Sequence, residues 1–314
     1  MAYGNGTGAS FGIATETTYG TYVAPDHFTE FNTESLKFRP VRAQGMGLRA
    51  GGVFPRKQRR VTPLSDAGGD VTFDLTDKSA GLILAHMWGS FPTKVGGAFT
   101  FTPGTVDGHY FTSQVGVPLL SGTVDPKTLT GCKITDWELS VGQGAIVVGK
   151  ITIDAQAFSR STGLATPSYV STLVPFHFAQ AVLKLGGSTV ANVTDWTLSG
   201  SNTLKVDRNN IGSAGLKAEP VHNGHKTITG SMNAEFTNTT AYAAFLADSD
   251  VSMQITLTSG AQVIDITIPC VRYDDGTPEV GGPEVVMQSL PFTVLDDGTN
   301  PVFSAVYTTA ETSL

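Results

Sequence analysis

The chain is poor in cysteine and in charge. Only two of its 314 residues are cysteines, Cys132 and Cys270, too few for a disulfide framework. Each lies in or beside a strand-like stretch, and we interpret both as small buried hydrophobes. Charged residues make up 15% of the chain, well below the roughly 25% of typical soluble domains. Much of the surface must therefore be neutral or covered by a partner.

Long apolar runs are also missing. No stretch of about 18 apolar residues occurs, so we expect no helix that inserts into a membrane. Residues 1–6 carry neither the basic nor the apolar segment of a secretory signal peptide. We therefore expect synthesis in a cytoplasm.

Catalytic and ligand-binding patterns are equally scarce. His222 and His225 have a possible metal spacing, but Asn-Gly between them indicates a turn, and no carboxylate or cysteine set accompanies them. The other histidines flank no nucleophile motif, and Gly45-Met46-Gly47 lacks the third glycine of a dinucleotide fingerprint. Asp274-Asp275 and Asp296-Asp297 each precede glycine, which favours turns over metal sites. We expect no catalytic residue, no metal, no cofactor and no enzymatic activity.

What charge there is lies unevenly along the chain. Residues 35–65 contain no acid and 8 of the 20 basic residues, which leaves 12 basic against 27 acidic residues elsewhere. A cationic segment on an otherwise anionic chain suits head-to-tail self-association. We predict an inter-subunit contact through Phe54, Arg56, Lys57, Arg59 and Arg60. A solvated face and direct nucleic-acid binding are the alternatives, and Phe54 is the only aromatic residue interleaved with these cations.

Strand patterns dominate the sequence. Apolar residues alternate with polar ones from Val251 to Thr258 and again from Ile264 to Ile268, and Ser259-Gly260 lies between the two runs. This pattern predicts a β-hairpin with one apolar and one polar face. Further strands are expected near residues 28–38, 53–62, 69–76, 131–141, 150–154, 179–186, 192–206, 225–236, 285–294 and 302–308.

The chain also repeats itself. Residues 34–38 (ESLKF) and 47–50 (GLRA) return as 202–206 (NTLKV) and 215–218 (GLKA), both at an offset of 168. Gly69 and Gly230 begin a second match at an offset of 161. We therefore expect a duplicated building block.

Each copy carries one predicted helix. Asp77 can cap a helix over residues 78–88 that ends at Gly89, and Asn238 can cap one over 239–247. We predict a first domain over residues 1–165, a second over 176–314, and a Ser/Thr/Pro-rich linker over 159–175. The first domain includes an N-terminal arm and a long basic loop, 51–68, which makes the Ala50–Gly69 interval seven residues longer than its counterpart.

An apolar-Thr-acid-aromatic pattern ends in Phe31, Trp137 and Trp196. We interpret it as a recurrent strand with an inward aromatic ring. A carbohydrate-stacking role for the two tryptophans is the alternative.

The order of several short strings resembles the major tail tube proteins of long-tailed (siphovirus-type) bacteriophages. They are Gly12–Thr21 (GIATETTYGT), Ala24-Pro25, Leu48–Gly51, Gly68–Phe73 and Thr277–Pro283 (TPEVGGP). The resemblance implies a mainly β fold, here two tandem β-sandwich or half-barrel units, each with one short flanking helix. It also implies rings whose inner strands join in a continuous β-barrel, and stacking of those rings into a virion tail tube through which the genome is ejected.

From the resemblance and the duplication we predict a trimeric ring with pseudo-sixfold symmetry; the runner-up is a ring of six chains in which one copy lines the lumen. Implied partners are further copies of the chain and the tail tip or baseplate, tape measure and tail terminator proteins, with DNA passing through without specific binding. Assembly is expected in the bacterial host cytoplasm. A capsid- or tail-associated β-sandwich that binds or decorates remains the alternative function.

Overall fold

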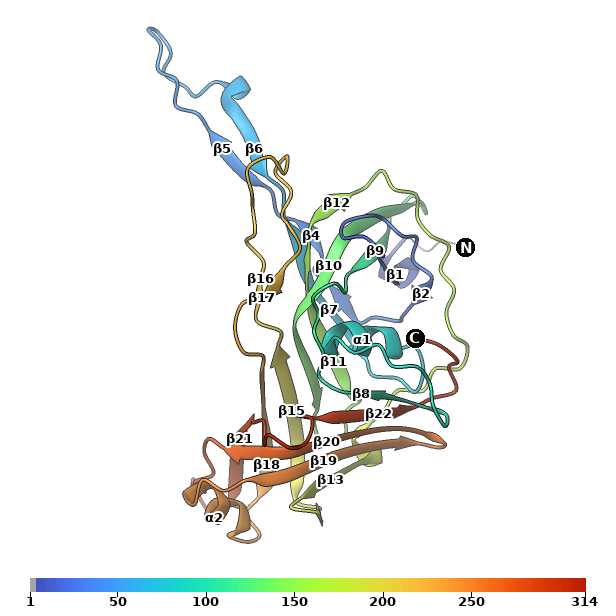
Figure 1. Ribbon diagram of the computed structural model, residues 1–314, viewed down its shortest axis with the longest axis vertical. Helices are drawn as coiled ribbons and strands as arrows, with labels where there is room; N and C mark the ends of the chain where they lie inside the picture. The colour runs from blue at the N-terminus through green and yellow to red at the C-terminus, as the bar shows by residue number, and fades with distance from the viewer. Residues whose placement is uncertain (1–3) are drawn as a thin grey trace.

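The structure, a computed structural model, describes residues 4–314 and is mainly β, with two short α-helices (Figure 1). The predicted fold class is thereby confirmed. Residues 1–3, part of the N-terminal segment weighed above as a signal peptide, lie outside the described residues.

The first half of the chain contains these elements: η1 (Gly6–Gly8), β1 (Ser10–Thr15), β2 (His27–Phe28), β3 (Thr33–Glu34), β4 (Lys37–Phe38), β5 (Val41–Gln44), η2 (Lys57–Arg59), β6 (Arg60–Leu64), β7 (Ala67–Asp74), α1 (Gly81–Trp88), β8 (Ala98–Phe101), β9 (Phe111–Pro118), β10 (Val124–Val141), β11 (Val148–Ala155) and β12 (Ala157–Ser159).

The second half contains η3 (Phe178–Gln180), β13 (Ala181–Leu185), β14 (Ser188–Val190), β15 (Val193–Ser201), β16 (Leu204–Lys205), β17 (Val221–His222), β18 (Thr227–Glu235), α2 (Thr240–Leu246), β19 (Val251–Ser259), β20 (Gln262–Tyr273), β21 (Met287–Val294) and β22 (Ser304–Thr308). The predicted 251–268 hairpin is confirmed: Ile255 pairs with Ile266, and Gly260 turns the chain in the left-handed region.

The same strand pairings occur in both halves. β1 pairs with β2 and β9 as β13 pairs with β14 and β19. β10 pairs with β9, β11 and β12 as β20 pairs with β19, β21 and β22. β7 pairs with β11 and with β3 and β4, as β18 pairs with β21 and β15. The duplication is therefore one of topology.

One antiparallel ladder joins the two halves. β10 pairs with β15, so the main sheet runs β3/β4–β7–β11–β10–β15–β18–β21–β20–β19–β13–β14. No pairing among residues 4–314 connects β3 or β4 with β14, and β3 and β4 pair with β7 alone. The expected β-barrel is therefore not closed within one chain, which instead carries open strand edges.

The long strand β10 serves two sheets because it changes direction at a bulge. Its first part pairs with β9 and β12 and its second with β11 and β15; the register shifts between Leu129 and Cys132. Gly131, in the left-handed region at φ 63°, occupies that bulge. β20 shifts register in the corresponding place, between Ile268 and Val271.

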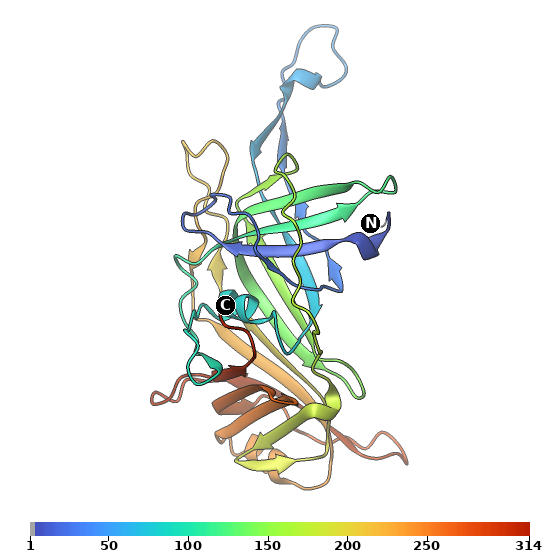
Figure 2. The same cartoon turned by 90° about the vertical axis from the view of Figure 1, so that its right-hand side faces the viewer.

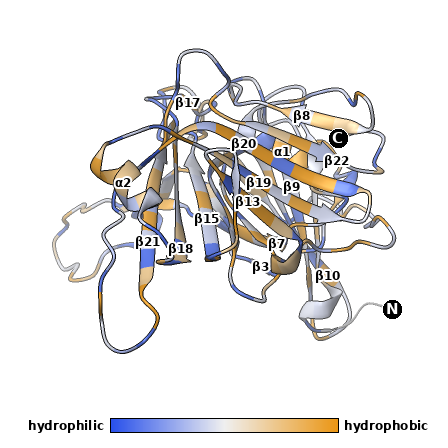
Figure 3. Ribbon diagram, turned by 90° about the horizontal axis from the view of Figure 1, so that it is seen from below, coloured by the Kyte–Doolittle hydropathy of each residue, from blue (hydrophilic) through white to orange (hydrophobic). Residues whose placement is uncertain are grey.

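A single hydrophobic core extends through both halves. Seen from below, β13, β19 and β20 form one layer with apolar positions along them (Figure 3). Trp88 at the end of α1 contacts Trp137 and also Phe303 from the second half. Every residue of α1 is buried, whereas no residue of α2 is.

The first helix starts later than predicted. α1 begins at Gly81 and ends at the left-handed Gly89 as expected, but Asp77 does not cap it. The Asp77 carboxylate accepts from the Val174 amide instead, and Ser79 adopts a left-handed backbone conformation whose carbonyl accepts from Thr29. The second helix begins at Thr240, one residue later than predicted, with Thr239 at its N-cap position; Asn238 Oδ1 still accepts from the Thr240 amide. Between β12 and η3 the chain forms only isolated bridges, so the linker at 159–175 stays a prediction.

Candidate assembly surfaces

The main sheet has one buried and one polar face where the two copies meet. Side chains alternate along its strands: Trp137 and Leu139 of β10 are buried, whereas Asp136, Glu138 and Ser140 are not. The polar face comprises Asp70, Thr72, Asp74, Asp136, Glu138, Ser140, Lys150, Thr152, Thr197, Ser199, Ser201, Thr227, Thr229 and Ser231. We call this set the polar face.

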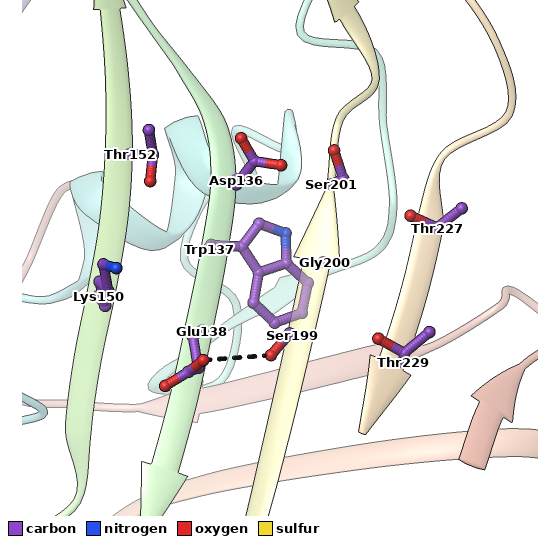
Figure 4. Close-up of a pocket in the computed structure, with 10 residues that line it drawn as sticks. All are labelled: Asp136, Trp137, Glu138, Lys150, Thr152, Ser199, Gly200, Ser201, Thr227 and Thr229. Carbon is purple, nitrogen blue, oxygen red and sulfur yellow. Dashed lines mark hydrogen bonds between the residues drawn. The ribbon is translucent and has the colours of Figure 1, made fainter. Parts of the chain in front are cut away.

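Figure 4 shows its centre, a shallow open depression across β11, β10, β15 and β18. Ser199 Oγ donates to Glu138 Oε2 over 3.5 Å, across the junction between the copies. Behind it, a Cβ added at Gly200 would come within 2.3 Å of the Trp137 ring. Glycine at this position therefore lets the indole pack flat against the neighbouring strand.

The charge of the polar face is net acidic. Asp70, Asp74, Asp136 and Glu138 outnumber its one cation, Lys150, which lies 3.5 Å from Asp70. Hydroxyls fill most other positions. A hydroxyl-rich surface with excess negative charge repels phosphate and offers few cations for it to bind.

The residues predicted for an inter-subunit contact lie on a hairpin that stands away from the body. β5 and β6 form this hairpin, which both views show projecting alone beyond the rest of the molecule (Figures 1 and 2). Phe54 is 85% exposed, and Met46, Leu48 and Val53 are exposed with it. We call residues 41–64 the basic hairpin.

The cations of the basic hairpin have no acidic partner in the described part of the chain. Arg56, Lys57, Arg59 and Arg60 are exposed, and no ion pair within residues 4–314 involves them. Arg59 folds back over Gly45 and Gly47, where an added Cβ at Gly47 would meet its guanidinium. The structure thus brings the predicted residues together on one free surface, and the contact itself stays a prediction.

The corresponding hairpin of the second copy, β16 and β17, lies on the first copy through charges that sequence reasoning missed. Lys217 Nζ is 2.6 Å from both Asp66 and Asp154, and Lys133 Nζ is 2.6 Å from Glu219. Burial raises the pKa of Asp154 against the opposing effect of Lys217. In the sequence, the one indication of a buried ion pair was the position of Lys133 between the apolar residues Cys132 and Ile134.

The remaining candidates do not form a reactive site. His222 Nδ1 contacts the Asn202 carbonyl, and within residues 4–314 no three metal-ligating side chains gather. Asp275 and Asp297 accept from backbone amides of their own turns, as predicted. Trp137 and Trp196 are both buried, so the carbohydrate-stacking alternative is wrong, and Cys132 and Cys270 are buried free thiols as interpreted.

One buried histidine predicts acid sensitivity. Burial lowers the pKa of His86 to about 3, with a smaller contribution from His109, and the ring packs against Phe91 and Phe111. Because the folded pKa lies below the unfolded value of roughly 6.5, only the unfolded chain binds this proton as pH falls. We expect a loss of about 2 kcal/mol of stability between pH 7.5 and 5 from this group. Urea unfolding of the unassembled chain should show that His86→Leu lacks this loss; equal pH slopes in both proteins would contradict the assignment.

Comparison with known proteins gives one family. The sequence model described as phage tail tube protein matches residues 6–294, nearly the whole chain. No curated protein gives a significant match. No helix within residues 4–314 is long and apolar enough to cross a membrane. With its duplicated β fold and this match, the chain belongs to the phage tail tube protein family, whose role is structural rather than enzymatic and whose place is the virion tail.

Proposed function

We propose that three chains form one closed ring with pseudo-sixfold symmetry, and that rings stack into the tube through which the genome leaves a siphovirus-type virion. The observation that carries this proposal is the ladder between β10 and β15, which merges both copies into one sheet with one polar face. Six copies from three chains would repeat that junction six times around a lumen. Assembly would take place in the bacterial host cytoplasm.

The unequal burial of the two helices supports a neighbour beside the second copy. The second copy covers α1: Asn202 Nδ2 donates to the Met87 carbonyl, and Phe303 contacts Trp88. Within residues 4–314 no element covers α2 in this way, and its Leu246 is 65% exposed. A following chain in the ring would supply the missing cover.

The runner-up, a ring of six chains in which one copy lines the lumen, is less well supported. Both copies contribute hydroxyl side chains to the same polar face, on adjacent strands, and the first copy adds its four carboxylates. A ring that used one copy would leave half of this face outside the lumen. In the trimeric ring the whole face lines the channel, and its net negative charge lets DNA pass without specific binding.

Ring stoichiometry tests the proposal directly. We expect native mass spectrometry of isolated rings to give three chains, and averaged electron micrographs of end-on rings to show six density lobes that are alike only in alternate positions. Six chains per ring would reject the trimer in favour of the runner-up. Monomers at all concentrations would favour the binding or decoration module.

The basic hairpin is proposed to join consecutive rings. It occurs once per chain, so a trimeric ring presents three such hairpins, each with Phe54 and four unpaired cations. At the tube ends, the same ring faces would meet the tail tip or baseplate and the tail terminator, and the lumen would hold the tape measure protein.

A further inference from the structure

The intrachain ladder between β10 and β15 is a template for the boundary between chains. Within each chain, residues 136–141 pair antiparallel with residues 196–201: Glu138 faces Ser199 and Leu139 faces Leu198. If the proposed ring exists, the second copy of one chain must meet the first copy of the next in an equivalent way. Because the two copies share one topology, the strand correspondences between them identify the two segments that would meet at the boundary between chains.

The first edge follows from β20. Ile134 of β10 pairs with Ile153, which pairs with Gly69, and Tyr273 of β20 likewise pairs with Phe292, which pairs with Gly230. Tyr273 therefore corresponds to Ile134. With the β10 bulge between Ile134 and Asp136 carried over to the chain after Tyr273, residues 275–280 correspond to the β10 segment 136–141. Yet residues 275–280 form no strand and pair with none.

The second edge follows from β3 and β4. Glu34 pairs with Val71 and Trp196 pairs with Met232, so residues 34–39 correspond to the β15 segment 196–201. Their side away from β7 has no strand partner among residues 4–314. One chain thus carries both halves of a junction that it cannot complete alone.

We infer that, in the proposed ring, residues 275–280 of one chain extend and pair antiparallel with residues 34–39 of the next, in the register of the intrachain junction. Thr277 then faces Lys37, Pro278 faces Leu36, and Glu279 faces Ser35. This inference rests on the proposed ring. It adds to that ring a coil-to-strand transition of the 275–280 segment.

The hydrogen bonds of Leu36, on the open edge at residues 34–39, are compatible with a proline as its partner. The Leu36 amide donates to the side chain of Glu34, and its carbonyl accepts from Lys127 Nζ, so charged side chains occupy both edge groups. Such charges suppress uncontrolled strand pairing. The carbonyl of Pro278 can replace the Glu34 side chain as acceptor for the Leu36 amide. Proline has no N–H to donate to the Leu36 carbonyl, but Lys127 Nζ already donates to that Leu36 carbonyl.

The charges on the polar side of this edge also favour pairing of residues 275–280 with residues 34–39. Lys37 corresponds to Ser199, and the diagonal neighbours of its partner Thr277 are Asp275 and Glu279. Opposite charges on diagonal cross-strand positions attract. Two carboxylates from one chain therefore flank one ammonium group from the next.

Disulfide trapping tests the register. Thr277 and Lys37 would form a pair without mutual backbone hydrogen bonds, with Cα atoms roughly 4.5 Å apart, inside the disulfide range. We expect Lys37→Cys with Thr277→Cys to yield covalently linked dimers and trimers for most chains in oxidised rings. The native Cys132 and Cys270 are buried, and each single variant controls for them.

Two matched controls set the scale. Glu138→Cys with Ser199→Cys lies at the intrachain junction and should form a disulfide within each chain, before assembly. Lys37→Cys with Glu279→Cys is diagonal, roughly 7–8 Å apart, and should cross-link poorly. Trimeric rings that link only through the diagonal pair, or not at all, would overturn the inference and leave the ring proposal intact. Absence of rings from the unmodified chain would defeat both.

Hydrogen exchange gives a readout without substitution. In this register the amides of Thr277 and Glu279 point away from the neighbouring chain and Pro278 has no amide, so Val280, opposite Glu34, is the informative position. Its exposed amide should exchange quickly in the monomer and at least tenfold more slowly in rings. Equal exchange in monomers and rings would also overturn the inference, even if a cysteine variant failed to fold.

Discussion

Reversal of four charges on the basic hairpin is expected to abolish tube elongation and leave a folded subunit. The variant carries Arg56→Glu, Lys57→Glu, Arg59→Glu and Arg60→Glu, which changes the formal net charge of −7 by eight units. All four side chains are exposed and form no ion pair with any residue that the structure describes. Surface substitutions of this kind usually alter stability by about 0.5 kcal/mol or less each.

The expected partner surface is acidic. No basic residue follows Arg272, whereas seven acidic residues do. The segment after β20 lies beside α2, since a Cβ at Gly276 would touch Phe245, and α2 lies at the end of the molecule opposite the basic hairpin (Figure 1). In a head-to-tail stack, the cations of one ring would approach this acidic end of the next. Glutamates would replace that attraction with repulsion.

Electron microscopy and sedimentation of concentrated protein would measure elongation. A matched control variant keeps the charge: it carries Arg56→Lys, Lys57→Arg, Arg59→Lys and Arg60→Lys. It should still form tubes, with weaker contacts between rings wherever an arginine makes a bidentate contact. Salt should shorten wild-type tubes if exposed charges dominate. Tubes of normal length from the glutamate variant would refute the role assigned to the basic hairpin.

Much of this fold was predictable because local patterns suffice for it. Alternation over residues 251–268 identified a hairpin, and the glycine at 89 identified the end of α1. The start of α1 was not predictable, since the Ser79 backbone is held by Thr29, some fifty residues away. Tertiary hydrogen bonds here overrode a plausible cap.

The register of the duplication shows a second limit. The matching strings suggested an offset of 168, but Glu34 and Trp196 occupy corresponding positions, an offset of 162. Pairing with β7 and β18 sets strand register, whereas the strings GLRA and GLKA lie in hairpins of unequal length. Similar letters in loops therefore do not align the strands beside them.

The basic hairpin could be predicted from charge clustering, because a run of unpaired cations is visible in one dimension. The polar face and the buried ion pairs could not, because they depend on which strands become neighbours. Lys217 meets Asp66 and Asp154 across large sequence separations. Nothing local distinguishes it from an exposed lysine.

That buried lysine supports the second large prediction. Lys217→Met should destabilise the subunit by about 3–5 kcal/mol, the typical cost of removing one partner of a buried ion pair. The Lys217 side chain is 3% exposed and that of Asp154 is 7% exposed, so the carboxylate would remain buried with only the Arg39 guanidinium, 3.6 Å away, near it. Chemical denaturation of the unassembled chain measures the loss.

A control on the same hairpin separates burial from charge. Lys205 pairs with Asp207 at 2.9 Å, but both side chains are largely exposed, so Lys205→Met should cost less than about 1 kcal/mol. A second reading comes from pH. Burial already raises the pKa of Asp154, and without Lys217 that pKa rises further.

A carboxyl group with a raised folded pKa contributes stability at low pH that is lost as pH rises. The deficit of Lys217→Met should therefore shrink as pH falls toward 4 and grow toward pH 8, while that of Lys205→Met stays small throughout. Equal costs for the two variants, or a deficit independent of pH, would show that the ion pair does not anchor the second hairpin to the first copy. If both predictions hold, the two hairpins differ because one is anchored within the chain by buried charge and the other keeps its charge free for the next ring.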